Sequence, residues 1–236
     1  MIDFHTHILP GIDDGSRDSH MTRDMLLAER EHGVDKIVFT PHFYAQQENV
    51  QTFIRKRQEA YERTLELSSE LGLDMDFKLG AEVYYFPGIG RADMLPLLRM
   101  GDTNYLLLEM PFAQWTEEIY LDVVDILHKQ KIDIILAHIE RFYQFQKDKY
   151  IWKEIMKLPI VMQINTGSLF EWRTRRFDKK LILDGYKVLL GTDCHNMTSR
   201  VPNMREGRKM LEKKLCADFL NEIDYRGERV WSNEKI

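Results

Sequence analysis

The chain of 236 residues has a formal charge of -5 and is 44% hydrophobic, so it carries enough apolar side chain for one large core. This acidic balance gives no general attraction to nucleic acid or to anionic lipid. The first residues lack the basic start and apolar run of a signal peptide, and no apolar stretch reaches membrane-spanning length. We therefore expect a cytoplasmic protein without membrane insertion, forming a single domain over residues 1–236.

Short β-branched and apolar runs alternate along the chain with longer amphipathic stretches, as in a parallel sheet joined by crossover helices. Strands are expected at residues 1–7, 35–40, 77–84, 105–109, 132–138, 160–165 and 187–193. Helices are expected at residues 19–32, 50–71, 117–131, 150–157 and 202–214. Seven strands favour an α/β fold, a TIM-like barrel of about seven parallel β/α units, over an open sheet. The polar tail after about residue 225 is expected to fray.

Metal-ligand residue types stand at or just beyond the C-terminal ends of the expected strands, where barrel enzymes have their active sites. They are His5, His7, His42, Glu82, Glu109, His138, Asp193 and His195. Imidazoles mixed with carboxylates suit manganese, iron or zinc. Glu82 or Asp193 can also bridge two ions, so the set predicts a site with more than one metal ion.

Strand alternation adds geometry to this prediction, because residues two apart in a strand project to one side. His5 and His7 are therefore expected to hold one ion together, and Asp193 and His195 are expected to do the same. Cys194 then faces elsewhere.

Simpler interpretations stay open for single members of the set. A lone His-x-His pair such as His5 and His7 is equally compatible with buried histidines bonded to backbone. Glu109 can form an ion pair at a strand end, and His42 can belong to the turn at residues 40–43. The repetition of ligand types at so many separate strand ends favours a metal site.

Two neighbouring divalent ions activate water and neutralise the charge that develops on a phosphoryl group, so the site predicts phosphoester hydrolysis. Arg141, three residues past His138, is placed to contact phosphate oxygens, and Arg200 is a second candidate. A solvated surface position is the alternative for both arginines.

Two further groups carry weaker hypotheses. An aromatic leaving group can fit a slot made by Phe43, Tyr44 and Phe86, although core or rim packing is equally compatible with them. An acidic peptide can be attracted by a basic run, for which a solvated charge run is the commoner explanation. This run contains Arg173, Arg175 and Arg176.

A thiol mechanism is the main chemical alternative, because Cys194 and Arg200 have the Cys-x5-Arg spacing of thiol-based tyrosine phosphatases. Such an enzyme needs a loop of free backbone amides around the phosphate. The intervening residues contain no glycine and include the expected ligand His195. We therefore interpret the spacing as coincidence.

Three segments together resemble the PHP (polymerase and histidinol phosphatase) superfamily: residues 5–15 (HTHILPGIDDG), residues 81–84 (AEVY) and residues 192–196 (TDCHN). The closest likeness within it is to the bacterial tyrosine-protein phosphatases associated with capsule or exopolysaccharide genes. This likeness runs from Met1 through about Asn203. It implies a distorted barrel of seven β/α units, manganese dependence and a trinuclear site. The expected cofactors are thus two to three divalent ions, most simply Mn2+, with iron or zinc as alternatives.

The same resemblance assigns ligands position by position. It gives the first ion to His5, His7, Glu82 and Asp193. Glu82 would bridge to a second ion, which Glu109 and His138 also hold. The third ion would be held by Asp14, His42 and His195. The match of residues 136–141 supports Arg141 as a phosphate contact and leaves Glu140 without a role.

The resemblance also implies a substrate, the phosphotyrosine-bearing tail of a bacterial tyrosine autokinase that regulates capsular or extracellular polysaccharide synthesis. A histidinol-phosphate phosphatase or a proofreading exonuclease shares the metal site, because the surrounding loops select the substrate. The small size and acidic charge disfavour the exonuclease. A non-catalytic metal-binding regulator is the alternative from another class.

Overall fold

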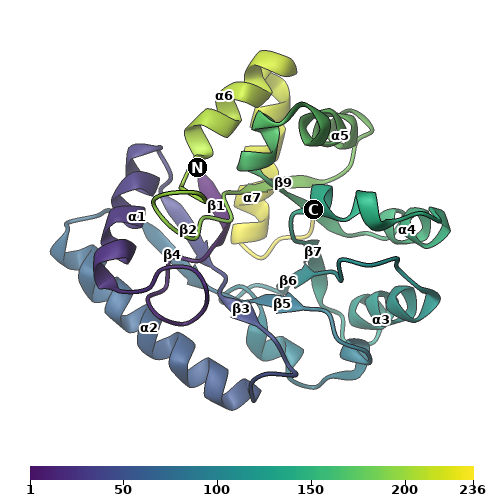
Figure 1. Ribbon diagram of the computed structural model, residues 1–236, viewed down its shortest axis with the longest axis horizontal. Helices are drawn as coiled ribbons and strands as arrows, with labels where there is room; N and C mark the ends of the chain where they lie inside the picture. Colours follow the sequence, from purple (N-terminus) through teal and green to yellow (C-terminus); the bar gives the residue numbers. More distant parts are fainter.

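A computed structural model describes residues 1–236 as a mixed α/β fold with parallel strands. One sheet has three strands in the order β1 (Ile2–Thr6), β2 (Lys36–Phe39), β4 (Asp76–Leu79). The other has six, in the order β3 (His42–Phe43), β5 (Glu82–Tyr84), β6 (Tyr105–Glu109), β7 (Asp133–Leu136), β8 (Val161–Asn165), β9 (Val188–Gly191). Helices surround the strands (Figure 1).

The structure has nine strands where the sequence predicts seven. The expected strand at residues 77–84 is two strands, β4 and β5, which are separated at Gly80 and Ala81. The strand β3 is added directly after Pro41, which has no N–H for the sheet ladder and therefore interrupts it. The two interruptions lie side by side, since the Gly80 amide donates to the Phe39 carbonyl at 2.8 Å. This is where three-stranded and six-stranded sheets separate.

The first strand and the end of the last strand also lie side by side. The amide of Asp193 donates to the carbonyl of His5 at 2.7 Å, and the amide of His7 donates to the carbonyl of Cys194 at 3.0 Å. A parallel bridge joins Thr6 and Cys194 between these bonds. The two parallel sheets are thus in contact along this seam.

Seven α-helices accompany the strands: α1 (Ser19–Glu31), α2 (Val50–Glu70), α3 (Glu117–His128), α4 (Tyr150–Met156), α5 (Trp172–Leu183), α6 (Met204–Lys214), α7 (Ala217–Trp231). Five of them match the expected segments closely. The side chains of Asp18 and Asn49 accept backbone N–H groups at the starts of α1 and α2, as N-cap residues do. No helix is long and apolar enough to cross a membrane.

Two helices were not predicted, and one of them corrects the expectation of a frayed tail. Helix α7 continues past residue 225 to Trp231, and Val230 on its last turn is buried. Apolar contacts with the sheets therefore order the tail, although its sequence is polar. The other is helix α5, which is rich in lysine and arginine; its sequence indicates either attraction of an acidic peptide or a solvated charge run.

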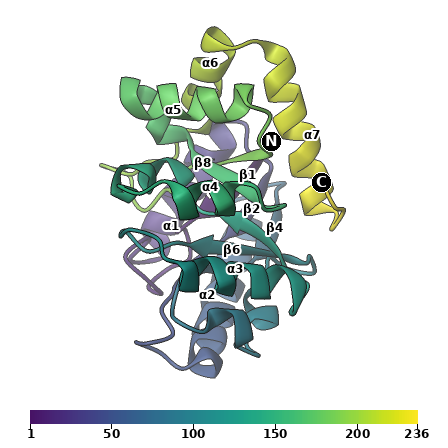
Figure 2. The same cartoon turned by 90° about the vertical axis from the view of Figure 1, so that its right-hand side faces the viewer.

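The apolar core has two parts. A cluster of 44 buried residues includes the strand faces and helix residues such as Leu26 and Phe53. A smaller cluster of 10 buried residues combines alternate residues of the strands, among them Phe4, Val38 and Leu189, with Val230 of α7. Helix α7 lies behind the strands in Figure 1 and along one side of the molecule in Figure 2. It covers this second cluster.

Candidate metal centre

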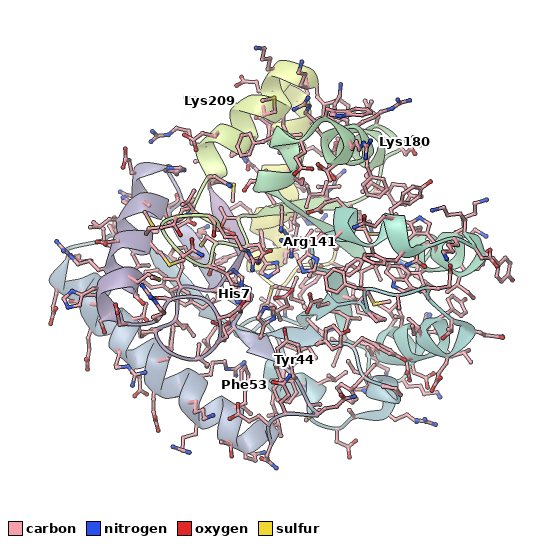
Figure 3. The ribbon with its side chains drawn as sticks, viewed as in Figure 1. His7, Tyr44, Phe53, Arg141, Lys180 and Lys209 are labelled. Carbon is pink, nitrogen blue, oxygen red and sulfur yellow. The ribbon has the colours of Figure 1, made fainter.

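The predicted ligand residues gather in three overlapping groups whose donor atoms lie within 4.8 Å of one another. The first group contains His5, His7, Glu82 and Asp193. The second contains His7, Asp14, His42 and His195, and the third contains His42, Glu82 and Glu109. His138 adjoins the third group, since its Nε2 atom lies 2.8 Å from Glu82 and 3.4 Å from Glu109. Figure 3 shows His7 and Arg141 both near the centre of the molecule.

A register shift in β1 directs His5 toward this centre. The pairing of β1 with β2 shifts between Asp3 and Thr6, and such irregularities re-aim side chains. As a result, the consecutive residues Phe4 and His5 are both directed into the interior between the strands. Phe4 packs in the smaller apolar cluster, whereas His5 donates from Nδ1 to the side-chain oxygen of Gln163 at 2.9 Å.

Two residues of the centre have a left-handed backbone conformation. Asp193 has a φ of 54° and His138 has a φ of 30°, conformations that non-glycine residues seldom adopt outside constrained sites. This geometry explains a correction. Asp193 and His195 fall in different groups, not in one, because strand β9 ends at Gly191 and alternation no longer applies.

Hydrogen bonds at Nδ1 orient three of the histidines. His5 donates to Gln163, His7 donates to Asp13 at 2.7 Å, and His195 donates to the Asp193 carbonyl at 3.0 Å. Each bond places the proton on Nδ1 and leaves the Nε2 lone pair for the centre, which is how metal-binding histidines are usually oriented. The Nε2 atoms of His5 and His7 lie 3.1 Å apart.

Asp13 organises the loop that precedes α1, and sequence reasoning missed it. Besides His7, its carboxylate accepts the amide of His42 at 3.0 Å and the amide of Gly15 at 2.9 Å. Only glycine fits at position 15, because a Cβ there would lie 2.2 Å from the His7 carbonyl oxygen. The loop thereby brings Asp14 beside His42 and His195. The available signal was the Asp-Asp pair following the His-x-His motif.

Two amide side chains on β8, Gln163 and Asn165, were also missed. The Gln163 oxygen accepts from His5 and from the amide of His138 at 2.8 Å, and its nitrogen donates to Asn165 at 2.8 Å. Asn165 in turn donates to Asp193 at 2.8 Å. The signal was present as two polar residues, two apart, in an otherwise apolar strand.

The donor atoms fit divalent cations better than they fit one another. Glu82 Oε2 lies 3.0 Å from His5, 3.2 Å from His7 and 3.0 Å from His42, yet it forms no hydrogen bond of acceptable geometry. His195 Nε2 is likewise buried without a hydrogen-bond partner. Nitrogen and oxygen atoms that converge without hydrogen bonding are what a shared cation requires.

The pKa values of the clustered histidines and carboxylates reflect the negative charge gathered at the centre. Burial lowers the pKa of His138, but hydrogen bonds with Glu109 and Glu82 outweigh it and raise the pKa to about 9. Burial raises the pKa of Glu82, yet the charges of His5 and His42 hold it well below the ordinary value. Burial and the neighbouring charge of His7 lower the pKa of His195 to about 3. Bound cations would supply the positive charge that these carboxylates otherwise take from protonated histidines.

Both candidate phosphate ligands reach the centre. Arg141 donates from Nη2 to Asp193 Oδ2 at 2.6 Å, and Arg200 Nη2 lies 2.6 Å from Asp193 Oδ1. Both side chains also line a cavity of about 300 Å³, together with Asn165 and Ser168. We call this cavity the arginine pocket. It offers guanidinium groups directly beside the metal-ligand residues.

The family model described as "Capsular polysaccharide synthesis, CpsB/CapC" matches residues 1–229. The chain belongs to this family. Two relatives share its length: tyrosine-protein phosphatase CpsB of Streptococcus pneumoniae is 26% identical over 94% of this chain and 94% of its own. Tyrosine-protein phosphatase YwqE of Bacillus subtilis is 26% identical over 100% of this chain and 93% of its own.

A solved structure is similar to this CpsB/CapC family member along the whole chain. It comes from the crystal structures of YwqE from Bacillus subtilis and CpsB from Streptococcus pneumoniae, described as unique metal-dependent tyrosine phosphatases. The TM-score is 0.87 with 23% identity, covering 100% of this chain and 96% of that one. The likeness supports the fold.

The thiol alternative does not fit this family member's geometry. Cys194 is fully buried, its Sγ atom lies 3.6 Å from Glu29, and it is not among the residues that line the arginine pocket. Burial and the charge of Glu29 raise the pKa of the thiol well above its usual value. A nucleophilic cysteine needs the opposite, a lowered pKa and access to phosphate.

The aromatic residues divide between core and mouth. Phe43 is buried and packs against Phe53, so it is a core residue. Phe86 packs against the larger cluster. Tyr44 alone of the three lies at the centre, with its ring 5.2 Å from that of His42. Phe112, which was not predicted, is 42% exposed with its ring 6.1 Å from that of His138.

Proposed function

We propose that the chain is a metal-dependent protein-tyrosine phosphatase. The observation that carries this proposal is the convergence of three His and carboxylate groups beside two arginines, in a member of a family whose relatives are named tyrosine-protein phosphatases. A cysteine mechanism has no support, since the Cys194 thiol is fully buried and does not line the arginine pocket.

The three groups, with His138 beside the third, support the following assignment of ligands. His5, His7, Glu82 and Asp193 would hold one ion. Glu82 would also serve a second ion, together with Glu109 and His138. Asp14, His42 and His195 would hold a third. The mixed nitrogen and oxygen donors suit Mn2+, with iron or zinc as alternatives.

Bound divalent ions supply activation of water and neutralisation of the phosphoryl charge. The side chains of the chain itself do the positioning. Arg141 and Arg200 are held by Asp193 on neighbouring sides of the arginine pocket and can each donate N–H groups to phosphate oxygens. These donors are fixed before substrate arrives, which is the condition for stabilising charge in the transition state. Arg141 and Arg200 are therefore the proposed catalytic residues.

Tyr44 and Phe112 are proposed to contact the aromatic ring of the substrate. They lie beside His42 and His138 respectively, so each presents an aromatic ring next to a proposed ligand. Aromatic pairs gain from offset or edge contacts beyond the area they bury. A phosphotyrosine side chain fits this combination of ring and phosphate.

The physiological substrate proposed here is the phosphotyrosine tail of a bacterial tyrosine kinase that regulates polysaccharide synthesis. The support is the family's description, capsular polysaccharide synthesis. We further propose that residues 1–236 act as one domain, in which the two sheets form a distorted barrel of about seven β/α units. The contacts of β1 with both β2 and the end of β9 support this arrangement.

The test is a metal count by elemental analysis on protein purified without chelator, combined with activity on a phosphotyrosine peptide, histidinol phosphate and p-nitrophenyl phosphate. We expect two to three ions per chain, manganese-dependent turnover of the peptide, and loss of activity after chelation. Faster turnover of histidinol phosphate would assign a small-molecule phosphatase. Metal binding without turnover of any substrate would assign a regulator.

A further inference from the structure

Helix α5 carries a cationic face that the proposed chemistry does not use. Its residues recur at helical spacing of three and four, so they project from one side. This side and one residue of α6 line a groove of about 480 Å³: Trp172, Arg175, Arg176, Lys179, Lys180, Leu183, Asp184 and Lys214. We call it the α5 groove. Figure 3 shows Lys180 on this outer helix, away from His7.

The charge of the α5 groove is opposite to that of the chain. Five cationic side chains line it with one carboxylate, that of Asp184, whereas the whole chain has a formal charge of -5. Asp184 is already paired with Lys180 at 2.6 Å. Arg176, Lys179 and Lys214 have no carboxylate within ion-pair distance. A local excess of positive charge attracts an anionic partner that the remaining surface repels.

The α5 groove begins where the arginine pocket ends. Glu171 and Thr174, at the start of α5, line the arginine pocket, and their neighbours Trp172 and Arg175 line the groove. The helix start is fixed here, because Arg175 donates to the Leu169 carbonyl at 2.8 Å. A chain leaving the arginine pocket therefore meets Trp172, which is 63% exposed, before it meets the cations.

The dimensions suit an extended peptide. The helix rises about 1.5 Å per residue, so the face from Trp172 to Leu183 is about 16 Å long. An extended chain covers about 3.3 Å per residue, so the groove matches roughly five residues. The cations line an open groove between α5 and the end of α6. This shape favours a strand of polypeptide over a membrane.

We propose that the α5 groove binds the acidic residues adjacent to phosphotyrosine in a peptide substrate, so that the enzyme selects phosphotyrosine in an acidic context. The proposal rests on the proposed phosphatase function and adds the class of sequence that the substrate carries. Arg176, Lys179 and Lys214 supply the attraction, and Trp172 supplies an aromatic contact at the entrance.

The test compares two double variants. The groove variant carries Arg176→Glu and Lys214→Glu, and the control variant carries Lys153→Glu and Lys209→Glu. Both pairs make the same change of charge, and the control residues are exposed without ion pairs. Three substrates are used: a phosphotyrosine peptide flanked by glutamates, the same peptide flanked by serines, and p-nitrophenyl phosphate. Binding of a fluorescent, unphosphorylated glutamate peptide is measured by anisotropy, with and without metal.

We expect the wild type to prefer the acidic peptide and added salt to remove the preference. The groove variant should lose roughly 10-fold in kcat/KM on the acidic peptide, through KM, because charge reversal at a rim weakens encounter and binding. Its kcat/KM on p-nitrophenyl phosphate should equal that of the wild type. The control variant should behave as the wild type with all three substrates.

The proposal would be overturned if the wild type had equal kcat/KM for the acidic and serine peptides and if the wild type and the groove variant gave equal anisotropy with the glutamate peptide. An equal loss in the control variant would also overturn it. If the wild type bound phosphatidylserine vesicles but not the peptide, and the groove variant lost vesicle binding, the groove would instead be assigned to a membrane. The anisotropy arm needs no turnover, so a chain inactive on every substrate contradicts the phosphatase proposal and still reports on the groove.

Discussion

Asp193 and His5 are far apart in the sequence, yet the amide of Asp193 donates to the carbonyl of His5 at 2.7 Å. Their side chains also converge, with Asp193 Oδ1 3.5 Å from His5 Nε2. The backbone contact therefore fixes the spacing of two proposed ligands. Asp193 also contacts His7 and both arginines of the pocket.

Asp193→Asn tests this position. The amide keeps the shape of the side chain but loses the negative charge that faces His5, Arg141 and Arg200. We expect at least one bound ion to be lost and activity to fall by roughly 100-fold or more, as when a group acting at both metal and transition state is removed. Elemental analysis and p-nitrophenyl phosphate kinetics check this. Unchanged metal content would remove Asp193 from the ligand set.

Arg141→Lys and Arg200→Lys test the arginine pocket. Lysine keeps the charge but lacks the planar pair of donors that binds phosphate oxygens. We expect each variant to lose on the order of 10-fold or more in kcat/KM while keeping its full metal content. The measurement is steady-state kinetics with a parallel metal count. Wild-type kinetics in either variant would assign that arginine to the surface.

Cys194→Ser tests the thiol alternative. Because the buried sulfur lies beside Glu29 and does not line the arginine pocket, we expect the variant to retain most of its activity. Chelation of the wild type should abolish activity, and Mn2+ should restore it. The reverse pair of results, an inactive variant and an active chelated enzyme, would favour the thiol mechanism.

Asp13→Ala tests whether Asp13 positions the proposed ligands His7 and His42 through its hydrogen bonds. Removing the carboxylate leaves His7 Nδ1 and the amide of His42 without their acceptor. We expect metal affinity to fall by roughly 10-fold to 100-fold, as for other residues that hold a metal-binding histidine. Titration with Mn2+ monitored by activity measures the shift. Excess metal should restore most of the turnover, whereas a loss that no metal concentration restores would contradict a supporting role.

The stability of the metal-free chain should depend on pH through His138. Its folded pKa is raised from 6.5 to about 9, so it stabilises the fold fully below pH 6.5, and this contribution is lost as pH rises through 9. The loss is on the order of 3 kcal/mol for a shift of this size. Thermal unfolding of chelated protein across this window measures it.

Added Mn2+ should reverse the trend, because deprotonated imidazole is the form that binds metal. The metal-bound chain should therefore gain stability relative to the chelated chain as pH rises. Equal pH dependence with and without Mn2+ would contradict a metal role for His138.

Much of the centre could be predicted from the sequence because the proposed ligands follow strand ends. Parallel strands end at one edge, so His5, His138 and Asp193 could be placed together without knowing the strand order. The division of Asp193 and His195 between two groups could not be predicted, because strand alternation places these two residues on the same side. The positive φ of Asp193 changes the direction of the chain after β9.

Other features depended on tertiary contacts that no local pattern contains. The break of one strand into β4 and β5 depends on the neighbouring break at Pro41. Helix α5 was missed because its lysines and arginines hide the apolar positions Leu181 and Ile182 on its buried side. Asp13 carries no periodic signal, since its role comes from a loop that folds back on His7.

Helix α7 packs against the first strand, and a methyl group at Gly227 would come within 3.2 Å of the Phe4 ring. The smaller apolar cluster is thus covered only when α7 meets a strand that lies far earlier in the sequence. Contacts of such long sequence separation slow folding, because a large loop must close before they form. During synthesis, this apolar cluster therefore stays exposed until α7 has emerged from the ribosome.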